Sequence, residues 1–208
     1  MSRPTRYERE AALAAAMRLF WSKGYHATSL KDLESALDMK PGSIYGAFVS
    51  KENLCLLTLE RYFESSLARF QSHMDKASSP LVGLADHLRG FARLGQDDDA
   101  RQICMVTKTL IDTKTTAPEI SARAKDYLGQ FRAAFAQGFE RAKAMGELPP
   151  DADSARLARR LQAHVAALRL ELHLGTDPAE VSALAEDLAQ AIEALRPTPV
   201  PPAEQDSQ

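Results

Sequence analysis

Residues 28–51 read TSLKDLESALDMKPGSIYGAFVSK, and this stretch predicts two short helices joined by a tight turn. Leu30, Leu33 and Leu37 recur at the spacing of one face of a helix. Asp38 follows the last of them, and aspartate tolerates the left-handed backbone that such a turn often needs. We therefore expect the first helix to end at this aspartate.

The second short helix is expected to begin directly after the turn. Pro41 suits its first turn, because the first N–H groups of a helix lack intrahelical partners and proline has none to lose. Ile44 and Phe48 give it one buried edge and leave small and polar residues on its outer face. Thr28 or Ser29 can cap the first helix by accepting a backbone N–H bond. Such a helix is not stable alone, but its shape is that of a reader of the DNA major groove.

The composition favours an all-α protein. The 208 residues are 45% hydrophobic, which is ample for a packed core, and only 7% are aromatic. No apolar run approaches the length of a membrane span, and the N-terminus lacks the apolar region of a signal peptide. We therefore expect a cytoplasmic protein with no membrane partner. The two distant cysteines agree with a reducing compartment.

Charge is distributed unevenly along the chain. The net charge is −2, but residues 1–51 carry a net charge of +3 and the remainder carries −5. A basic head on an acidic body suggests a polyanionic partner for the head only. A normal solvated surface would also explain three charges, so the helical motif is the stronger indication.

No arrangement of residues indicates an enzyme. The five histidines show no ligand spacing such as His-x-x-x-His, and neither a phosphate-binding loop nor a nucleophile elbow is present. Asp97, Asp98 and Asp99 are consecutive and invite comparison with a metal site, but adjacent carboxylates rarely converge on one ion. Negative charge at the N-terminus of a helix explains them better. We expect no catalytic residue, no metal and no cofactor.

Hydrophobic periodicity and Gly or Pro signals predict further helices, about nine in all. Residues 112–117 are polar and are expected to form a loop. Trp21 lies near the end of the first helix, where packing in the core is a better explanation than a functional contact. The helices expected outside the motif span about 7–23, 51–74, 80–94, 100–110, 118–145, 154–174 and 178–195.

The last two expected helices carry apolar stripes. Val181, Leu184, Leu188 and Leu195 alternate between spacings of three and four with Ala191 between them, as in the seam of a coiled coil. Two such helices form an antiparallel pair, and two copies could form a four-helix bundle in a homodimer. The alternative is that the stripe packs only on its own chain. The preceding helix contributes Leu161, Val165, Leu168 and Leu172 to the expected dimer interface.

Three motifs lie close together near the N-terminus. They are A-x-x-L-F-x-x-K-G-Y at residues 16–25, A-T-S-L-x-D-L at 27–33 and G-S-I-Y-G-A-F-x-S-K-E-x-L at 42–54. Together they resemble the DNA-binding domain of the TetR/AcrR family of bacterial transcriptional regulators. The rest of the chain matches that family only in helix order and length. The resemblance implies a helix-turn-helix DNA-binding domain at 6–52 and a helical effector-binding and dimerisation domain at 53–196. The tail at 197–208 is Pro-rich and polar and is expected to be disordered.

The same resemblance implies which residues contact a double-stranded DNA operator. Tyr45 and Lys51 match positions that clamp the phosphate backbone, although a core role for the tyrosine is the alternative. Gly46 and Ala47 match positions that face bases, and their small size leaves part of the specificity to DNA shape. Phosphate or base contacts are further implied at Thr28, Ser29, Lys40, Pro41, Gly42 and Ser43.

Three residues depart from the family pattern. Asp38 stands where the turn usually holds Gly, and it can adopt the same backbone. Glu34 replaces a small Ala and alters helix packing or lies at its edge. Lys40 replaces a Ser at the start of the second helix, which adds a cation near the phosphates and puts the usual capping bond in doubt.

The resemblance also implies a small-molecule effector bound in the C-terminal domain and coupled to DNA release. The residues expected to line its pocket also suit a plain hydrophobic core. An alternative effector mechanism is a thiol sensor of electrophiles or oxidants, with Lys108 stabilising a thiolate one turn away. Against it, a free cysteine is most often buried and inert. The expected pocket residues are Cys104, which is also the candidate sensor, Met105, Phe131, Phe135 and His164.

A third possibility is a helical interaction module that does not bind DNA. It would explain the last two helices but not the basic, capped helix pair with a small outer face. The sequence does not identify the operator, the effector or the regulated genes, or distinguish a repressor from an activator.

Overall fold

The computed structural model describes residues 6–95, 98 and 101–197, with side chains from Glu8 onward. Within these ranges the chain forms nine α-helices and no strand, which confirms the all-α prediction. Residues 1–5, two aspartates of the run Asp97–Asp99 and all but the first residue of the expected tail lie outside them. The helices are α1 (Arg6–Lys23), α2 (Leu30–Leu37), α3 (Pro41–Phe48), α4 (Lys51–Lys76), α5 (Pro80–Ala92), α6 (Met105–Thr113), α7 (Pro118–Ala144), α8 (Ser154–Leu174) and α9 (Pro178–Glu193).

The turn between α2 and α3 has the predicted backbone. Asp38 adopts a left-handed conformation, with φ 51° and ψ 43°. At the other end of α2, Ser29 is the N-cap, because its Oγ accepts the backbone N–H of Asp32 at 3.2 Å. The carboxylate of Asp32 accepts the backbone N–H of Ser29 at 2.8 Å, which completes a capping box. Of the two candidate caps, Ser29 therefore fills the role.

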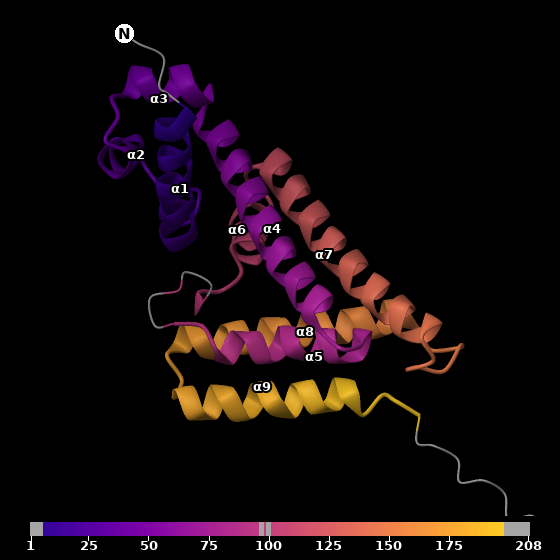
Figure 1. Cartoon of the computed structure of the whole chain (residues 1–208). Helices are drawn as coiled ribbons and strands as arrows, with labels where there is room; N and C mark the ends of the chain where they lie inside the picture. Colours follow the sequence, from indigo (N-terminus) through magenta and orange to yellow (C-terminus); the bar gives the residue numbers. More distant parts are fainter. Residues whose placement is uncertain (1–5, 96–97, 99–100, 198–208) are drawn as a thin grey trace, which may run out of the picture.

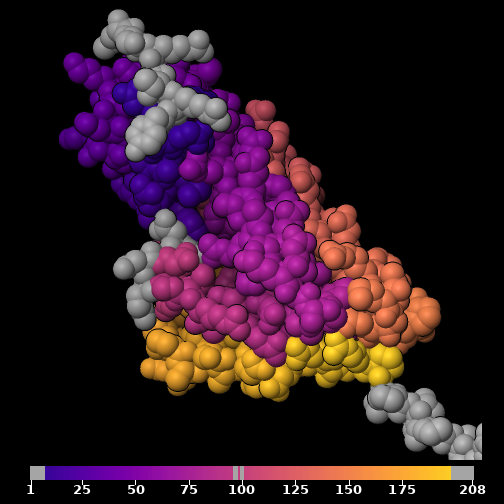
Figure 2. Space-filling model, viewed as in Figure 1, coloured from indigo at the N-terminus to yellow at the C-terminus, as the bar shows by residue number. Residues whose placement is uncertain are grey.

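The long helix α4 leads out of the N-terminal helices and into a larger helical body (Figure 1). In that body α7 runs beside α4, while α5, α8 and α9 form a layer at the opposite end from α3 (Figure 1). Arg89 of α5 fixes α9 to this layer, because its guanidinium binds Glu186 and Glu193 at 2.8 Å each. Figure 2 shows α9 along the lower edge of the body and the N-terminal helices at the top.

The buried hydrophobic residues form two clusters. The first contains the N-terminal core, including Leu33 and Phe48, and it continues into α6 and the first half of α7 through Met105, Val106 and Ile120. The second lies between α5, α8, α9 and the second half of α7. The core of the N-terminal helices is therefore continuous with part of the C-terminal body, so a movement of α6 or α7 reaches them through direct packing.

The prediction for α6 was wrong at both ends. The helix begins at Met105 rather than near residue 100, and it continues to Thr113 through part of the expected loop. Upstream of Met105, carbonyl groups serve other partners: Ile103 O accepts the indole N–H of Trp21 at 2.6 Å. The backbone before α6 is thus used to bind another element. Periodicity along one segment contains no information about such a partner.

The apolar stripe of α8 and α9 packs mainly on its own chain. Leu161, Leu168 and Leu172 are buried within the monomer, as is Val181, so these four do not form a free dimer surface. Their assignment to the dimer interface is corrected, and the alternative holds for them. Val165 lies on the internal side of α8, and Leu184, Leu188 and Leu195 are half-buried against the second cluster.

Candidate nucleic-acid interface and effector cavity

The outer face of α3 is small and exposed. Tyr45 is 41% exposed, which favours the predicted surface role over the core alternative. Gly42 and Gly46 have open space where a Cβ would stand, so Tyr45 is the large side chain that projects from this face. Lys40 is exposed at the N-cap and makes no side-chain capping bond, as the departure from the family pattern suggested. A groove can thus approach the backbone of α3 closely.

The inner edge of α3 is anchored firmly. Ile44 and Phe48 are completely buried, and the guanidinium of Arg9 from α1 lies 5.2 Å from the centre of the Phe48 ring. Burying two large side chains of an eight-residue helix supplies the stability that the helix lacks alone. The packing also fixes the rotation of α3, so that its small face points outward.

The end of α1 and the start of α2 form a charged corner. Lys23 binds Asp32 at 2.8 Å, and hydrogen bonds from Lys23 and Ser29 lower the pKa of that carboxyl. Lys51 places its Nζ 4.6 Å from the centre of the Tyr25 ring, and burial lowers the pKa of this half-buried lysine. These contacts hold three backbone segments together beside α3.

One residue predicted to contact DNA has no accessible side chain. Thr28 is completely buried, and its hydroxyl donates to Gly24 O at 2.6 Å. The hydroxyl is used to close the loop after α1, so its assignment as a phosphate ligand is corrected. The neighbouring Ser29 is exposed, although its hydroxyl is engaged with Asp32.

The connection between α3 and α4 is a strained γ-turn centred on Val49. Its φ is 69° and its ψ is −53°, and Ser50 N donates to Phe48 O at 2.7 Å across it. A positive φ at a β-branched residue is an outlier. Ser50 also caps α4, because its Oγ accepts Asn53 N at 3.0 Å. The turn sets the angle between the candidate recognition helix and the helix that leads into the body.

A group of hydrogen bonds joins α6 to the end of α1, and we call these contacts the α1–α6 clasp. Lys108 Nζ donates to the carbonyls of Trp21 at 2.8 Å and Ser22 at 2.6 Å. Asp112 Oδ2 accepts the backbone N–H of Tyr25 at 2.9 Å. The lysine neutralises the negative end of α1, and the carboxylate takes up an N–H of the loop that follows it. The clasp spans the two predicted domains.

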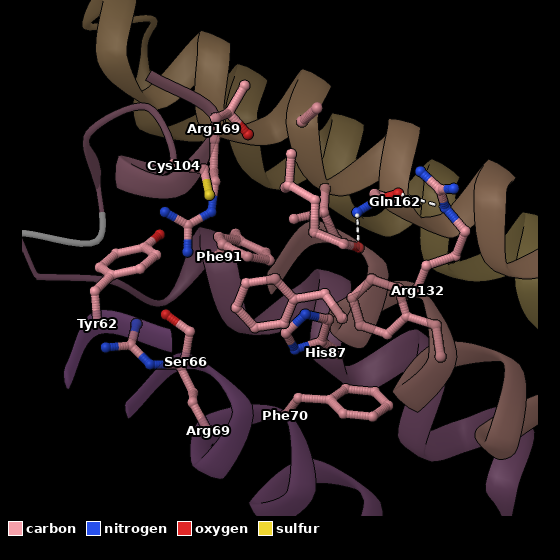
Figure 3. A pocket seen from close by; sticks show the side chains of 16 residues that line it. Tyr62, Ser66, Arg69, Phe70, His87, Phe91, Cys104, Arg132, Gln162 and Arg169 are labelled. Atoms are coloured by element: carbon pink, nitrogen blue, oxygen red, sulfur yellow. Dashed lines mark hydrogen bonds between the residues drawn. The ribbon is translucent and has the colours of Figure 1, made fainter. Parts of the chain in front are cut away.

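A cavity of about 210 Å³ lies between α4, α5, α7 and α8, and it touches the start of α6 (Figure 3). Cys104, Phe131 and Phe135 line it as predicted from the sequence. Met105 and His164 do not: Met105 is buried in the first hydrophobic cluster, and His164 lies elsewhere on α8. The sequence interpretation missed most of the lining, which includes Tyr62, Ser66, Arg69, Phe70, His87, Phe91, Thr107, Arg132, Gln162 and Arg169.

Some of the missed residues left a signal in the sequence. Arg169 lies four residues after Val165 and three before Leu172, so an arginine interrupts the inward face of an apolar helix. Such a residue is expected to serve an internal polar site. Tyr62 and His87 gave no comparable signal, because each is of intermediate burial preference and follows its helix's apolar pattern.

Burial controls the ionisable groups around the cavity. It lowers the pKa of His87 to about 3, with further contributions from His73, Arg169 and Arg69, so this ring is neutral. It also raises the pKa of Tyr62, which therefore stays a neutral phenol. The Nδ1 of His87 is buried without a hydrogen-bond partner among the described residues. The Oη of Tyr62 is also buried and makes no hydrogen bond of ordinary geometry there, although Cys104 and Ser66 lie close enough to influence its pKa. The cavity thus contains polar groups whose bonding is incomplete.

Lys108, which was expected to stabilise a thiolate at Cys104, makes its hydrogen bonds to other groups. Lys108 Nζ, expected near Cys104, instead donates to two carbonyls at the end of α1. Cys104 is half-buried and lines the cavity, whereas burial raises the pKa of Cys55 to about 12 and keeps that thiol protonated. The geometry therefore gives no specific indication of thiol sensing.

The outward face of α8 carries apolar side chains that stay exposed among the residues the structure describes. Leu170 is 45% exposed and Leu174 is 67% exposed, and both lie on the opposite side from the buried Leu168 and Leu172. Ala163 and Ala167 continue this face towards the N-terminus of the helix. Large exposed side chains next to small ones are typical of a helix–helix interface.

The helices and the surfaces they form correspond to a known family of proteins. The family described as "Bacterial regulatory proteins, tetR family" matches residues 12–57, and "Tetracyclin repressor-like, C-terminal domain" matches residues 80–190. The HTH-type transcriptional repressor ComR of Escherichia coli (strain K12) is 29% identical over 174 residues, which cover 83% of each protein. The regulator UidR of the same strain is 26% identical over 159 residues, covering 74% of this chain and 75% of that protein.

Solved structures agree with this assignment. A transcriptional regulator of the TetR family from Cytophaga hutchinsonii has a TM-score of 0.79 and 20% identity, and the match covers 95% of this chain and 98% of that one. A cysteine mutant of the TetR family regulator CifR, complexed with 26-base-pair operator DNA, has a TM-score of 0.78 and 28% identity, with coverage of 91% and 99%. Among the described residues, no helix has the length and apolar character required to cross a membrane.

Proposed function

The chain belongs to the TetR family of bacterial regulatory proteins. We propose that it represses transcription by binding a palindromic operator as a dimer. We further propose that it dissociates from this operator when a small molecule binds to it. The observation that carries the proposal is the α3 helix. Ile44 and Phe48 are buried, the outer face is exposed and small apart from Tyr45, and Lys40 makes no capping bond at the N-terminus. The similarity to CifR, whose structure contains operator DNA, supports the same reading.

The proposed DNA contacts divide by chemistry. Lys40, Tyr45 and Lys51 supply cations and a hydroxyl to phosphate oxygens. Gly46 and Ala47 let the groove approach the backbone, and the alanine methyl can pack on a thymine. The remaining proposed contacts are backbone or side-chain groups of Ser29, Pro41, Gly42 and Ser43.

The proposed dimer uses the outward faces of α8 and α9. Leu170 and Leu174 are the exposed anchors on α8. The half-buried Leu184 and Leu188 lie at the edge of α9, and Leu195 follows just after its end. Two antiparallel pairs packed on these faces form a four-helix bundle. A two-fold axis through the bundle then presents two α3 helices to two half-sites.

The proposed response to an effector runs through α6. Cys104 and Thr107, at the start of α6, face the cavity, while Lys108 and Asp112 hold the end of α1 through the clasp. A ligand that repositions the start of α6 therefore changes the position of α1, and α3 moves with it because both share one core. This is a two-state coupling between two sites.

The experiment that tests the proposal is fluorescence anisotropy on DNA from the region upstream of the protein's own gene, measured across a salt series. We expect tight, sequence-dependent binding with a steep dependence on salt, because Lys and Arg displace counterions from phosphates. If binding is weak and equal on scrambled DNA of the same length, other operators are sought by selection from genomic DNA fragments. Failure of that selection as well would contradict the proposed function.

A further inference from the structure

The charge of the cavity is one-sided. Arg69, Arg132 and Arg169 line it, and no Asp or Glu is present among the described residues of the lining. Arg69 lies 3.9 Å from Asp98, and the guanidinium of Arg132 donates to Gln162 Oε1 at 2.9 Å. The arginines therefore have protein contacts, but the lining as a whole carries positive charge. An arginine cannot lose its proton at any working pH, so this charge is permanent.

One end of the cavity concentrates hydrogen-bond donors. Figure 3 shows Tyr62, Ser66, Cys104 and Arg169 gathered at this end. The Arg169 guanidinium is buried, donates to Gln102 O at 3.4 Å, and lies 5.1 Å from the centre of the Phe91 ring and 5.9 Å from that of Tyr62. Tyr62 Oη, also buried, has no hydrogen-bond partner of ordinary geometry among the described residues. A phenol and a guanidinium side by side can both donate to the oxygens of one anion.

The middle of the cavity is apolar and aromatic. Phe70 and Phe91 lie between the donor end and the end that holds Arg132 and Gln162 (Figure 3), and Phe131 and Phe135 complete the ring of aromatic walls. The neutral His87 stands among them, with its ring centre 5.1 Å from that of Phe70 and 5.3 Å from that of Phe91. A flat apolar group can pack between these rings by stacked or edge contacts.

The volume limits the size of the occupant. The cavity holds about 210 Å³. An engineered protein cavity of roughly 150 Å³ holds one benzene molecule. The space here therefore suits one aromatic ring together with a short chain and a small polar head.

We propose that the effector is a small aromatic carboxylate, whose ring lies between the phenylalanines and whose carboxylate binds Arg169 and Tyr62. A cationic ligand is disfavoured by the three arginines, and a neutral ligand, although its oxygen can accept a hydrogen bond, supplies no negative charge to balance them. That this ligand acts as an effector rests on the proposed function, whereas its binding to the cavity can be measured without DNA.

The test uses three probes of equal size and different charge on the full-length, DNA-free protein. They are 3-phenylpropionate, 3-phenylpropionamide and 3-phenylpropan-1-amine, and calorimetry gives the Kd of each. Trp21 provides a second readout, because it is the sole tryptophan of the chain and packs edge-on against Tyr62 at 4.9 Å. We expect the acid to bind at least about ten-fold more tightly than the amide or the amine. Equal affinities, or no detectable binding of any probe, overturn the assignment.

Variants then locate the carboxylate. Tyr62→Phe removes one oxygen and keeps the ring, so its fold is expected to survive, and Arg169→Gln removes the buried charge. We expect both to reduce the preference for acid over amide to within about three-fold, with the amide affinity little changed. The matched control is Lys125→Gln, which removes an exposed cation of α7 outside the cavity. If both cavity variants kept the full preference, the proposed placement of the carboxylate would be wrong.

The two proposals fail separately. If the acid binds selectively but does not change the affinity for DNA, the ligand class stands and the coupling is wrong. If DNA binding is established but the amide or amine binds as well as the acid, the regulator function stands and the ligand class is wrong.

Discussion

The carboxylate of Asp112 accepts the backbone N–H of Tyr25 at 2.9 Å, although the two residues lie 87 positions apart in the chain. The same oxygen is 3.4 Å from His26 N, and it lies 3.1 Å from where a Cβ on Gly24 would stand. One side chain of α6 thus occupies the concave side of the loop that ends α1. The start of the same helix faces the cavity, so α6 contacts both the cavity and the loop that follows α1.

We expect Asp112→Ala to loosen the N-terminal helices selectively. Losing a charged acceptor leaves a backbone N–H without its partner, which costs about 1–3 kcal/mol. Amides of residues 24–33 should then exchange with deuterium about ten-fold faster, while those of α8 and α9 stay unchanged. Asp126→Ala is the control, because Asp126 is exposed on α7 and its carboxylate accepts from the side chain of Gln130 on the same helix. If Asp112→Ala changed the exchange rates of residues 24–33 no more than those of the other helices, the clasp would not stabilise this region specifically.

We expect Lys40→Gln to weaken DNA binding on every sequence by a similar factor. Lys40 is exposed at the N-terminus of α3 and makes no capping bond, so its charge is available to a phosphate. A dimer loses two phosphate contacts, one per protomer, and each contributes roughly −0.9 to the slope of log K against log salt. The slope should therefore become less steep by about 2. Lys114→Gln removes an exposed lysine at the end of α6 and should leave the slope unchanged. An unchanged slope in Lys40→Gln would place this residue away from the DNA.

Local patterns were sufficient to predict the N-terminal helices. The spacing of Leu33, Ile44 and Phe48 identified the buried face, and all three are completely buried. The backbone of Asp38 was predicted from its residue type and its place after the last apolar residue. Such features depend on neighbours within one or two helical turns, and the sequence records these directly.

The cavity and the clasp could not be predicted in the same way. Both are assembled from residues that are distant in the chain, such as Tyr62 with Arg169 and Asp112 with Tyr25. An apolar stripe also does not reveal which partner covers it: Leu168 turned inward and Leu170 outward, although both lie on one leucine-rich helix. Which leucine faces the core depends on tertiary packing, and the periodicity of one helix does not identify its packing partners.

We expect Val49→Gly to raise the stability of the N-terminal helices. The side chain is 77% exposed, so little packing is lost, while its φ of 69° is strained for a β-branched residue. Relief of roughly 1–3 kcal/mol of strain is offset by the larger entropy of glycine in the unfolded chain, about 0.5–1 kcal/mol. The net gain of about 1 kcal/mol should appear in denaturant unfolding. Val49→Ala keeps a Cβ at the same φ and should gain much less; equal gains would mean that the turn is not strained.

We expect Leu170→Asp to dissociate the dimer. Leu170 is 45% exposed on the outward face of α8, and a charge placed in an apolar interface is strongly unfavourable. Analytical ultracentrifugation should show monomers at micromolar concentration, and affinity for a two-half-site operator should fall with it. Met145→Asp is the control, because Met145 is 64% exposed at the end of α7 rather than on α8. A dimer that persists in Leu170→Asp would place the interface on another surface.

We expect the stability of the protein to fall below about pH 6.5 partly because of His87. Burial holds its pKa at about 3, compared with 6.5 for an ordinary histidine, so the unfolded chain binds a proton that the folded chain refuses. The stability contributed is complete above pH 6.5 and is lost as the pH falls towards 3, by about 1.4 kcal/mol per pH unit. Between pH 8 and pH 5 the loss from this residue alone is about 2 kcal/mol.

The comparison that isolates this effect is His87→Gln, which places an amide among Phe70, Phe91 and Phe135 and cannot titrate. Its absolute stability is expected to change, so the quantity to compare is the loss between pH 8 and pH 5 in urea unfolding. That loss should be smaller than in the unaltered protein by about 2 kcal/mol, whereas His173→Gln, at an exposed position of α8, should reproduce the unaltered protein. If His87→Gln lost as much stability as the unaltered protein, the ring would have to be protonated in the fold. The cavity would then carry one more positive charge beside its three arginines.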